Sequence, residues 1–259
     1  MRFNVSADLT YDFAAPCEVL LLLEAADGGD QAVREERLAM STQPRITRLD
    51  DLETGERRIA FIASDTVQIQ YEARVEVADR DTALAGAPAA TLEQLPPGAL
   101  RHLRPSRYCP SDRFERFVNR EFNGSVGGDR VVALLEWIAA HVDYVSGVSD
   151  AATTALDTFV DRSGVCRDFT HLAISLCRAS QIPARAVSAY GWQLDPPDMH
   201  AVLEVYVGGK WRLADPTGKV RPEGLVRVAT GRDAADIAFM SIFGQAQLIT
   251  QSFAIEQID

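Results

Sequence analysis

The sequence predicts an α+β protein, with an antiparallel β-sandwich over residues 1–95 followed by a mixed domain of helices and strands over residues 96–259. Residues 1–77 have the pattern of short strands separated by turns. Helical periodicity dominates from Asp112 to about Ser180, and strand patterns return after Pro183. The second domain is therefore expected to place its helices first and its sheet afterwards.

Strands are expected in the first domain at residues 2–10, 19–23, 45–49, 57–63 and 66–77. The last of these is the clearest, because apolar side chains alternate there with polar ones. Such a period of two indicates a strand with one buried face. Residues 27–30, Asp-Gly-Gly-Asp, are typical of a turn between strands.

A segment rich in alanine, glycine and proline, residues 83–97, is the expected linker. Helices are expected to begin at Asp112 and Asp129 and to cover residues 154–161. A fourth, apolar helix continues to about residue 180. Ser163 is its expected N-cap, which would place Cys166 at the third helical position.

Strands are then expected at residues 184–192, 200–207 and 210–214, with further β structure at 226–228 and 245–257. Gly208 and Gly209 form a two-residue turn, which fixes the register of the hairpin. If Val207 lies opposite Lys210, the ladder places Val202 opposite Asp215. His200 is then diagonal to Asp215 on the same face of the sheet.

This register provides a base for a nucleophilic cysteine. Cys166 lies in the first turn of a helix, where unpaired N–H groups and the helix dipole favour a thiolate. An aspartate that binds one imidazole nitrogen leaves the other free to exchange a proton with a thiol. Cys166, His200 and Asp215 therefore form a candidate nucleophile, base and orienting group.

The same residues carry a family resemblance. Several blocks occur in order: Gly164-Val165-Cys166-Arg167-Asp168, Ile182-Pro183-Ala184-Arg185, Met199-His200-Ala201 and Asp215-Pro216-Thr217. Together they closely resemble the bacterial transglutaminase-like superfamily, and residues 1–95 resemble its N-terminal β domain. The resemblance implies a papain-like α+β catalytic core in which Cys166 is the nucleophile, His200 the base and Asp215 the orienting residue.

Three further residues are candidates for substrate binding or for an oxyanion hole: Tyr144, Val202 and Asp168. Tyr144 could line the site, although packing at the core or rim is an equal alternative. Val202 stands where the family often has tryptophan, and this smaller side chain could widen the site. For Asp168 an interaction with the helix N-terminus or with a neighbouring arginine is the favoured alternative.

Some nearby residues are expected to have no catalytic role. His171 is close to Cys166 in sequence, but five helical residues turn it roughly 140° away. Cys177 is expected to pack in the core, and Cys17 and Cys109 are expected to be structural.

Composition restricts the possible partners. The net charge of -11 argues against nucleic acid and against an anionic membrane, because phosphate binding needs clustered lysine and arginine. No C-x-x-C spacing or calcium loop is present in the sequence, so neither a metal nor another cofactor is expected. The first residues lack the pattern of a signal peptide, which favours a cytoplasmic protein.

The expected function is a cysteine-dependent acyl transfer on a peptide or carboxamide bond, with a thioester on Cys166 and a peptide or protein as substrate. Hydrolysis, as a peptidase or amidase, is favoured. Transfer to an amine, which would cross-link proteins, needs the same three residues and is the first alternative. A non-catalytic module that binds a peptide or protein on the same fold is the second, and the sequence leaves the oligomeric state open.

Overall fold

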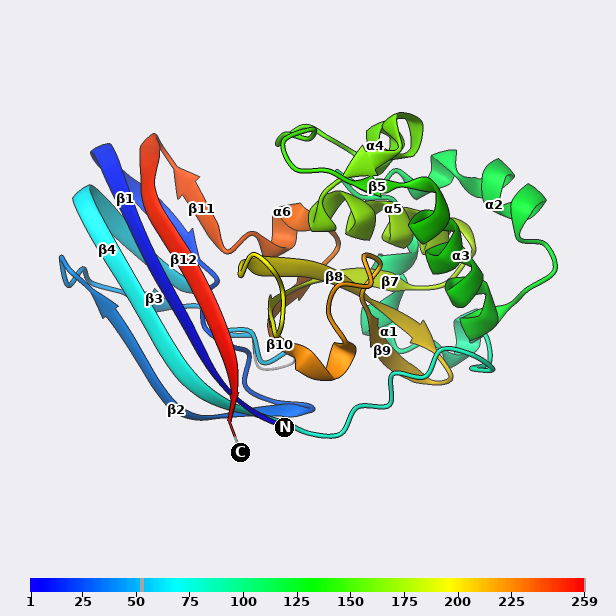
Figure 1. Cartoon of the computed structure of the whole chain (residues 1–259), viewed down its shortest axis with the longest axis horizontal. Helices are drawn as coiled ribbons and strands as arrows, with labels where there is room; N and C mark the ends of the chain where they lie inside the picture. The colour runs from blue at the N-terminus through cyan, green and yellow to red at the C-terminus, as the bar shows by residue number, and fades with distance from the viewer. Residues whose placement is uncertain (52–53, 259) are drawn as a thin grey trace.

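The computed structural model describes residues 1–51 and 54–258 and contains two lobes (Figure 1). One lobe is an antiparallel sheet of six strands, and the other is a four-stranded sheet covered by helices. The α+β class predicted from the sequence is confirmed. No helix among the described residues is long and apolar enough to cross a membrane.

The first sheet is built on two long neighbouring strands, β1 (Arg2–Leu21) and β4 (Ile59–Val77). Each of them joins two strands that the sequence predicts separately. The other members are β2 (Gln31–Met40), β3 (Thr47–Arg48), β11 (Met240–Phe243) and β12 (Ala246–Ile258). The predicted sandwich is thus antiparallel as expected, but its strands are hydrogen-bonded as one sheet because β1 and β4 continue past the irregularity between Phe13 and Cys17.

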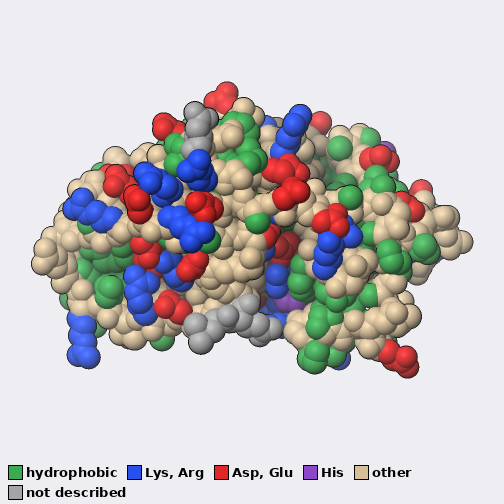
Figure 2. Space-filling view, turned by 90° about the horizontal axis from the view of Figure 1, so that it is seen from below, with side chains coloured by type: hydrophobic (Ala, Val, Ile, Leu, Met, Phe, Trp, Pro, Cys, Tyr) green, Lys and Arg blue, Asp and Glu red, His purple; other side chains and the backbone are tan. Residues whose placement is uncertain are grey.

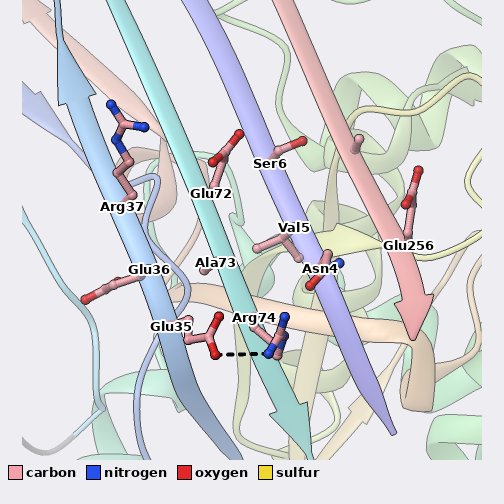
Figure 3. Close-up of a pocket in the computed structure, with 11 residues that line it drawn as sticks. Asn4, Val5, Ser6, Glu35, Glu36, Arg37, Glu72, Ala73, Arg74 and Glu256 are labelled. Atoms are coloured by element: carbon pink, nitrogen blue, oxygen red, sulfur yellow. Dashed lines mark hydrogen bonds and ion pairs between the residues drawn. The ribbon is translucent and has the colours of Figure 1, made fainter. Parts of the chain in front are cut away.

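Alternation of side chains gives this sheet one buried and one solvent-exposed face. In the second half of β4 the buried positions are Val67, Ile69, Tyr71, Ala73, Val75 and Val77, the alternation that the sequence predicts. The opposite face is polar. An open hollow of about 480 Å³ lies on the sheet across β2, β4, β1 and β12 (Figure 3). There Arg74 forms an ion pair with Glu35 at 3.0 Å.

The C-terminal strands belong to this first sheet, which corrects the placement of residues 245–257 in the second domain. β12 pairs antiparallel with β1, for example Val5 with Ile255, and β11 pairs with the end of β1. The chain therefore returns to the first lobe after completing the second. In Figure 1 the C-terminal strand β12, in red, lies beside the N-terminal strand β1, in blue. A division at residue 95 does not describe the lobes, because residues 240–258 join the N-terminal sheet.

The second lobe begins with an irregular connection and short helices: η1 (Leu92–Gln94), α1 (Pro97–Leu100), η2 (Arg101–Leu103) and η3 (Ser111–Arg113). Four longer helices follow: α2 (Glu115–Glu121), α3 (Gly127–His141), α4 (Ala155–Asp161) and α5 (Cys166–Ala179). Their positions agree with the predicted periodicity. Helix α5 is almost entirely buried and packs against β7 and β8 of the second sheet.

The second sheet has the order β10-β7-β8-β9 and is antiparallel throughout. Its strands are β7 (Ala184–Gly191), β8 (Met199–Val207), β9 (Lys210–Ala214) and β10 (Leu225–Gly231). The turn η4 (Pro222–Gly224) precedes β10 and the short helix α6 (Ala234–Ile237) follows it. Val207 lies opposite Lys210, so the register predicted from the glycine turn is confirmed.

A buried carboxylate connects the lobes. Glu204 of β8 accepts hydrogen bonds from Arg185 Nε at 2.6 Å and from Arg227 Nη1 at 2.9 Å. Arg227 also pairs with Asp30 of the first lobe, and Arg80 donates to the same aspartate. These ion pairs therefore link the first lobe, through Asp30, to β8, the strand that carries His200.

Replacing Glu204 with alanine is expected to lower the free energy of unfolding by about 3–5 kcal/mol, because two largely buried guanidinium groups lose their carboxylate. The side chains of Arg185 and Arg227 are 17% and 15% exposed. The midpoint of urea unfolding measures this loss. Glu35→Ala is the matched control, since its exposed pair with Arg74 should contribute less than about 1 kcal/mol. Equal losses for the two variants would contradict the prediction.

Candidate active site

The site begins at the N-terminus of α5, but not with the predicted cap. Val165 is the N-cap and Cys166 is the first residue of the helix rather than the third. Ser163 is instead extended, because Ser163 and Gly164 form a short parallel pair, β6 (Ser163–Gly164), with β5 (Asp143–Tyr144). Cys166 remains at the positive end of the helix dipole and is partly exposed.

Asp168 fixes the first turn of α5. Its carboxylate is fully buried, and Oδ2 accepts a hydrogen bond from the Val165 N–H at 2.9 Å. Oδ1 accepts from Arg167 Nε at 3.2 Å. A Cβ atom on Gly164 would lie 2.6 Å from Asp168 Cβ, so the close approach requires glycine. Asp168 is therefore a positioning residue, the alternative that the sequence favours.

Pairing between β5 and β6 brings Tyr144 to the cysteine. Tyr144 lies opposite Gly164, two residues before Cys166. Burial raises the pKa of the Tyr144 hydroxyl, and its interactions with Cys166 involve both the thiol and the backbone. Lys219 lies over the Tyr144 ring, with Nζ 4.3 Å from its centre. Tyr144 is 40% exposed and thus forms part of the wall beside the sulfur.

The predicted contact between His200 and Asp215 is confirmed. His200 Nε2 donates to Asp215 Oδ2 at 2.9 Å, and both side chains are almost completely buried. Nδ1 is buried and has no well-aligned hydrogen-bond partner among the described residues, so it is the nitrogen left for the thiol. Burial lowers the pKa of His200, but Asp215 and Cys166 outweigh it and raise the pKa to about 9.

Asp215 is held by donors on both carboxylate oxygens. Besides His200, the Val220 N–H donates to Oδ2 at 2.9 Å. The backbone N–H and the hydroxyl of Thr217 each donate to Oδ1 at 2.8 Å. Burial raises the pKa of Asp215, but the imidazole and the backbone donors hold it below its usual value. A charged carboxylate is therefore maintained next to the ring.

Sequence reasoning did not assign a role to Thr217, although the signal was present. An aspartate followed two residues later by threonine is typical of a turn in which the side chain accepts local hydrogen bonds. Asp198 was also missed: it lies at the surface, but neighbouring groups partly desolvate its carboxyl and raise its pKa, and it interacts electrostatically with His200. It lies in the loop before β8, where no periodic pattern identifies it.

The candidate Val202 contributes no surface to the site, and neither does His171, for which no catalytic role is expected. Val202 is completely buried, and it packs with Val187, Ala189, Leu213, Val220 and Leu225. Val202 therefore packs in the core beneath the site, on the same strand as His200, and does not line the site. His171 is 1% exposed and stacks on Tyr108 with ring centres 5.0 Å apart, and its Nε2 accepts a hydrogen bond from the Ala234 N–H. Burial lowers the pKa of His171 to about 4, which does not suit a base near neutral pH.

The other cysteines differ from Cys166 in their environment. Cys177 and Cys109 are fully buried, and burial raises the pKa of each thiol to about 12. Cys17 is partly exposed, like Cys166, but belongs to the first sheet. Among the residues that the structure describes, no three His, Cys, Asp or Glu side chains form a group that could hold a metal ion.

Comparisons with known proteins place this site in a family. The profile of the transglutaminase-like superfamily matches residues 116–216, a range that contains Cys166, His200 and Asp215. A candidate cysteine protease from Cytophaga hutchinsonii has a similar crystal structure, with a TM-score of 0.92 and 35% sequence identity, covering 100% of this chain and 91% of that one. The periplasmic domain of TgpA from Pseudomonas aeruginosa is more distant, with a TM-score of 0.44 and 18% identity over 85% of this chain and 91% of that one.

A curated relative is similar over a shorter range. The uncharacterized protein ML0607 from Mycobacterium leprae is 32% identical over 149 residues, which are 52% of this chain and 52% of that protein. The chain thus spans about half the length of this relative. The profile match and the 35% identity along the whole fold lead to one assignment: the chain belongs to the transglutaminase-like superfamily.

Proposed function

We propose that the chain is a cysteine-dependent acyl-transfer enzyme that hydrolyses peptide or carboxamide bonds. The observation that carries the proposal is the buried pair of His200 and Asp215, whose free imidazole nitrogen is left for Cys166 at the start of α5. A protonated imidazole beside the sulfur favours the thiolate. Membership of the superfamily and the similarity to a candidate cysteine protease support the same chemistry.

The proposed reaction has two steps. The Cys166 thiolate adds to the substrate carbonyl carbon, and the Nδ1 proton of His200 passes to the leaving nitrogen as the C–N bond breaks. This leaves a thioester on Cys166 and releases an amine. A water molecule then gives a proton to Nδ1 and attacks the thioester, which releases the acid and restores the thiolate.

Hydrolysis is proposed over amine transfer, and the two differ only in what attacks the thioester. Acetylation by p-nitrophenyl acetate should form the same thioester on Cys166 without knowledge of the natural substrate. Mass spectrometry then measures how the acetyl-enzyme partitions between water and an added primary amine. Preferential formation of the acetylated amine at millimolar amine would favour transfer over the proposed hydrolysis.

Thiol labelling tests the nucleophile directly. Cys166 is expected to react with iodoacetamide faster than Cys17, which is also partly exposed and lacks a histidine partner. The advantage should disappear in His200→Ala, because the imidazolium that favours the thiolate is removed. Equal rates for the two cysteines in the unmodified protein would argue against the proposal.

The reaction rate is expected to fall as the pH rises through about 9, where His200 loses its proton. The raised folded-state pKa has a consequence for stability as well. The stabilisation from His200 is fully present below its ordinary value of 6.5 and is lost as the pH rises towards 9. Hydrolysis rates of an amide substrate, whose leaving nitrogen takes the Nδ1 proton, and thermal unfolding across this range measure both effects. A hydrolysis rate that keeps rising to pH 10 would contradict the assignment.

Tyr144 and the Cys166 backbone N–H are the proposed donors to the oxyanion, since Tyr144 interacts with the thiol and backbone of Cys166. Tyr144→Phe is expected to lower kcat about 10²-fold, as the loss of one oxyanion donor does elsewhere. Tyr108→Phe is the control, because that hydroxyl donates to the Ala151 carbonyl instead. An unchanged kcat for Tyr144→Phe would leave Tyr144 as a packing residue.

A further inference from the structure

A groove of about 320 Å³ separates the two lobes near the turn of the β8–β9 hairpin. Glycines of the first lobe, including Gly28, Gly29 and Gly55, form one wall, and Arg101, Arg185 and Trp211 belong to the other. Figure 2 shows the hollow between the lobes, which holds a histidine and both basic and acidic side chains. We call it the interdomain groove. Trp211 precedes Asp215 by four residues along the chain, which corresponds to roughly 13 Å of extended strand.

Arginines outnumber carboxylates in the described lining of the interdomain groove. Arg101, Arg185 and Arg227 line it, and Asp27 is the one carboxylate among the described lining residues. The side chains of Arg185 and Arg227 are 17% and 15% exposed, and the carboxylates that pair with them, Glu204 and Asp30, are not part of the lining. Buried charges in proteins are normally paired. The positive partners of these pairs therefore lie in the groove, in a protein whose net charge is -11.

Arg101 is the third of these cations and is exposed at the edge of the groove. Its Nε donates to the Gly98 carbonyl oxygen at 3.4 Å, and no ion pair involves it among residues 1–51 and 54–258. Asp27 is the one carboxylate among the described lining residues, and its Oδ1 accepts from the Val33 N–H. The lining is thus cationic even after Asp27 is counted.

A buried polar atom beside the groove is also unpartnered. His102 is 4% exposed, and its Nδ1 has no hydrogen-bond partner in the described part of the chain. Its ring meets Trp211 edge-on, with centres 5.5 Å apart. Burial, followed by the charges of Arg185, Arg178 and Arg101, lowers the pKa of His102 to about 3. A neutral imidazole surrounded by cations indicates an excess of positive potential there.

The arginine geometry is already fixed. Arg185 lies over the Trp211 ring, with its guanidinium carbon 4.3 Å from the ring centre, and Glu204 holds its other side. Such stacked and hydrogen-bonded guanidinium groups keep their planar array of donors oriented, and that array matches carboxylate and phosphate groups. An anion would therefore meet donors that need little rearrangement.

We propose that the interdomain groove binds a small anion carrying carboxylate or phosphate groups, with Arg101 as its exposed contact. The site is separate from Cys166 and does not depend on the proposed reaction. Because residues of both lobes line it, a bound anion would hold the lobes together and stabilise the folded chain. The volume restricts the ligand to a small molecule, at the lower end of known pockets.

The experiment titrates the whole chain with inorganic phosphate and, separately, with citrate, while chloride keeps the ionic strength constant. A saturable rise in the thermal unfolding midpoint is expected with at least one of them. Arg101→Gln should weaken the apparent affinity about tenfold or more, because a charged hydrogen bond is lost. Arg120→Gln is the control, since Arg120 is 74% exposed and pairs with Glu121. A response to phosphate alone or to citrate alone identifies which group is recognised.

Tryptophan fluorescence locates the bound anion. A saturable change in emission is expected from the unmodified protein and from Arg120→Gln, and it should be absent from Trp211→Phe. The proposal is overturned if neither anion gives a saturable shift, if Arg101→Gln binds as tightly as the control, or if the emission change persists without Trp211. The last result would place the anion elsewhere on the surface.

Discussion

Cys166→Ala is expected to abolish acetylation by p-nitrophenyl acetate and to lower kcat on amide substrates about 10⁶-fold, as removal of a catalytic nucleophile does in hydrolases. The expectation follows from the position of Cys166. Cys166 is the first residue of α5 and is partly exposed, and its interactions help raise the pKa of His200. Without sulfur no thioester can form, and only polarisation of the carbonyl remains.

Cys17→Ala is the matched control for this loss. Cys17 is partly exposed like Cys166, but it lies on β1 of the first sheet. The control variant should keep the burst of p-nitrophenol and the acetyl adduct of the unmodified protein. A burst that survives in Cys166→Ala, or that disappears in Cys17→Ala, would mean that the reactive thiol is not the one at the helix start.

Local signals predicted the geometry around His200 and Asp215 correctly. The Gly208-Gly209 turn fixes the register of β8 against β9, because both glycines adopt positive φ values of 62° and 78°. Alternation then puts His200 and Asp215 on one face, and the hydrogen bond of 2.9 Å confirms it. Turn chemistry and period-two patterns are local, so one sequence suffices to predict them.

Contacts between distant segments were not predictable in this way. The helix start was misplaced because Ser163 pairs with Asp143, and no local pattern in the sequence reveals that pairing. The partner of β12 is β1, at the other end of the chain, and periodicity does not identify strand partners. β2 was missed because most of its residues are at least partly exposed and Arg34 to Arg37 interrupt any apolar alternation.

Asp215→Asn is expected to lower kcat about 10⁴-fold while the protein stays folded, the size of loss known for such a change in a serine protease triad. The reason lies in the donors around the carboxylate. His200 and the Val220 N–H donate to Oδ2, and the N–H and hydroxyl of Thr217 donate to Oδ1. An asparagine has only one acceptor oxygen, so its NH₂ group must face one of these two pairs.

Either orientation of the amide disturbs the site. If the NH₂ faces His200, Nε2 must accept the hydrogen bond, so the neutral ring carries its proton on Nδ1. Nδ1 then faces Cys166 already protonated and cannot accept the proton of the thiol. If the NH₂ faces Thr217, it meets the backbone N–H as a second donor, and the neutral oxygen supports the imidazolium less well. In both cases the pKa of His200 should fall from about 9 towards 6.5, and the alkaline limit of the rate should move with it.

The pH profile separates this effect from simple damage to the fold. Asp198→Asn is the control, because that carboxyl interacts with His200 through charge but makes no hydrogen bond to the ring. It should change kcat only a few-fold and leave the alkaline limit close to pH 9. A loss in Asp215→Asn with an unshifted alkaline limit would mean that Asp215 only supports the fold. A shifted limit with an intact unfolding transition would identify it as the group that sets the proton affinity of His200.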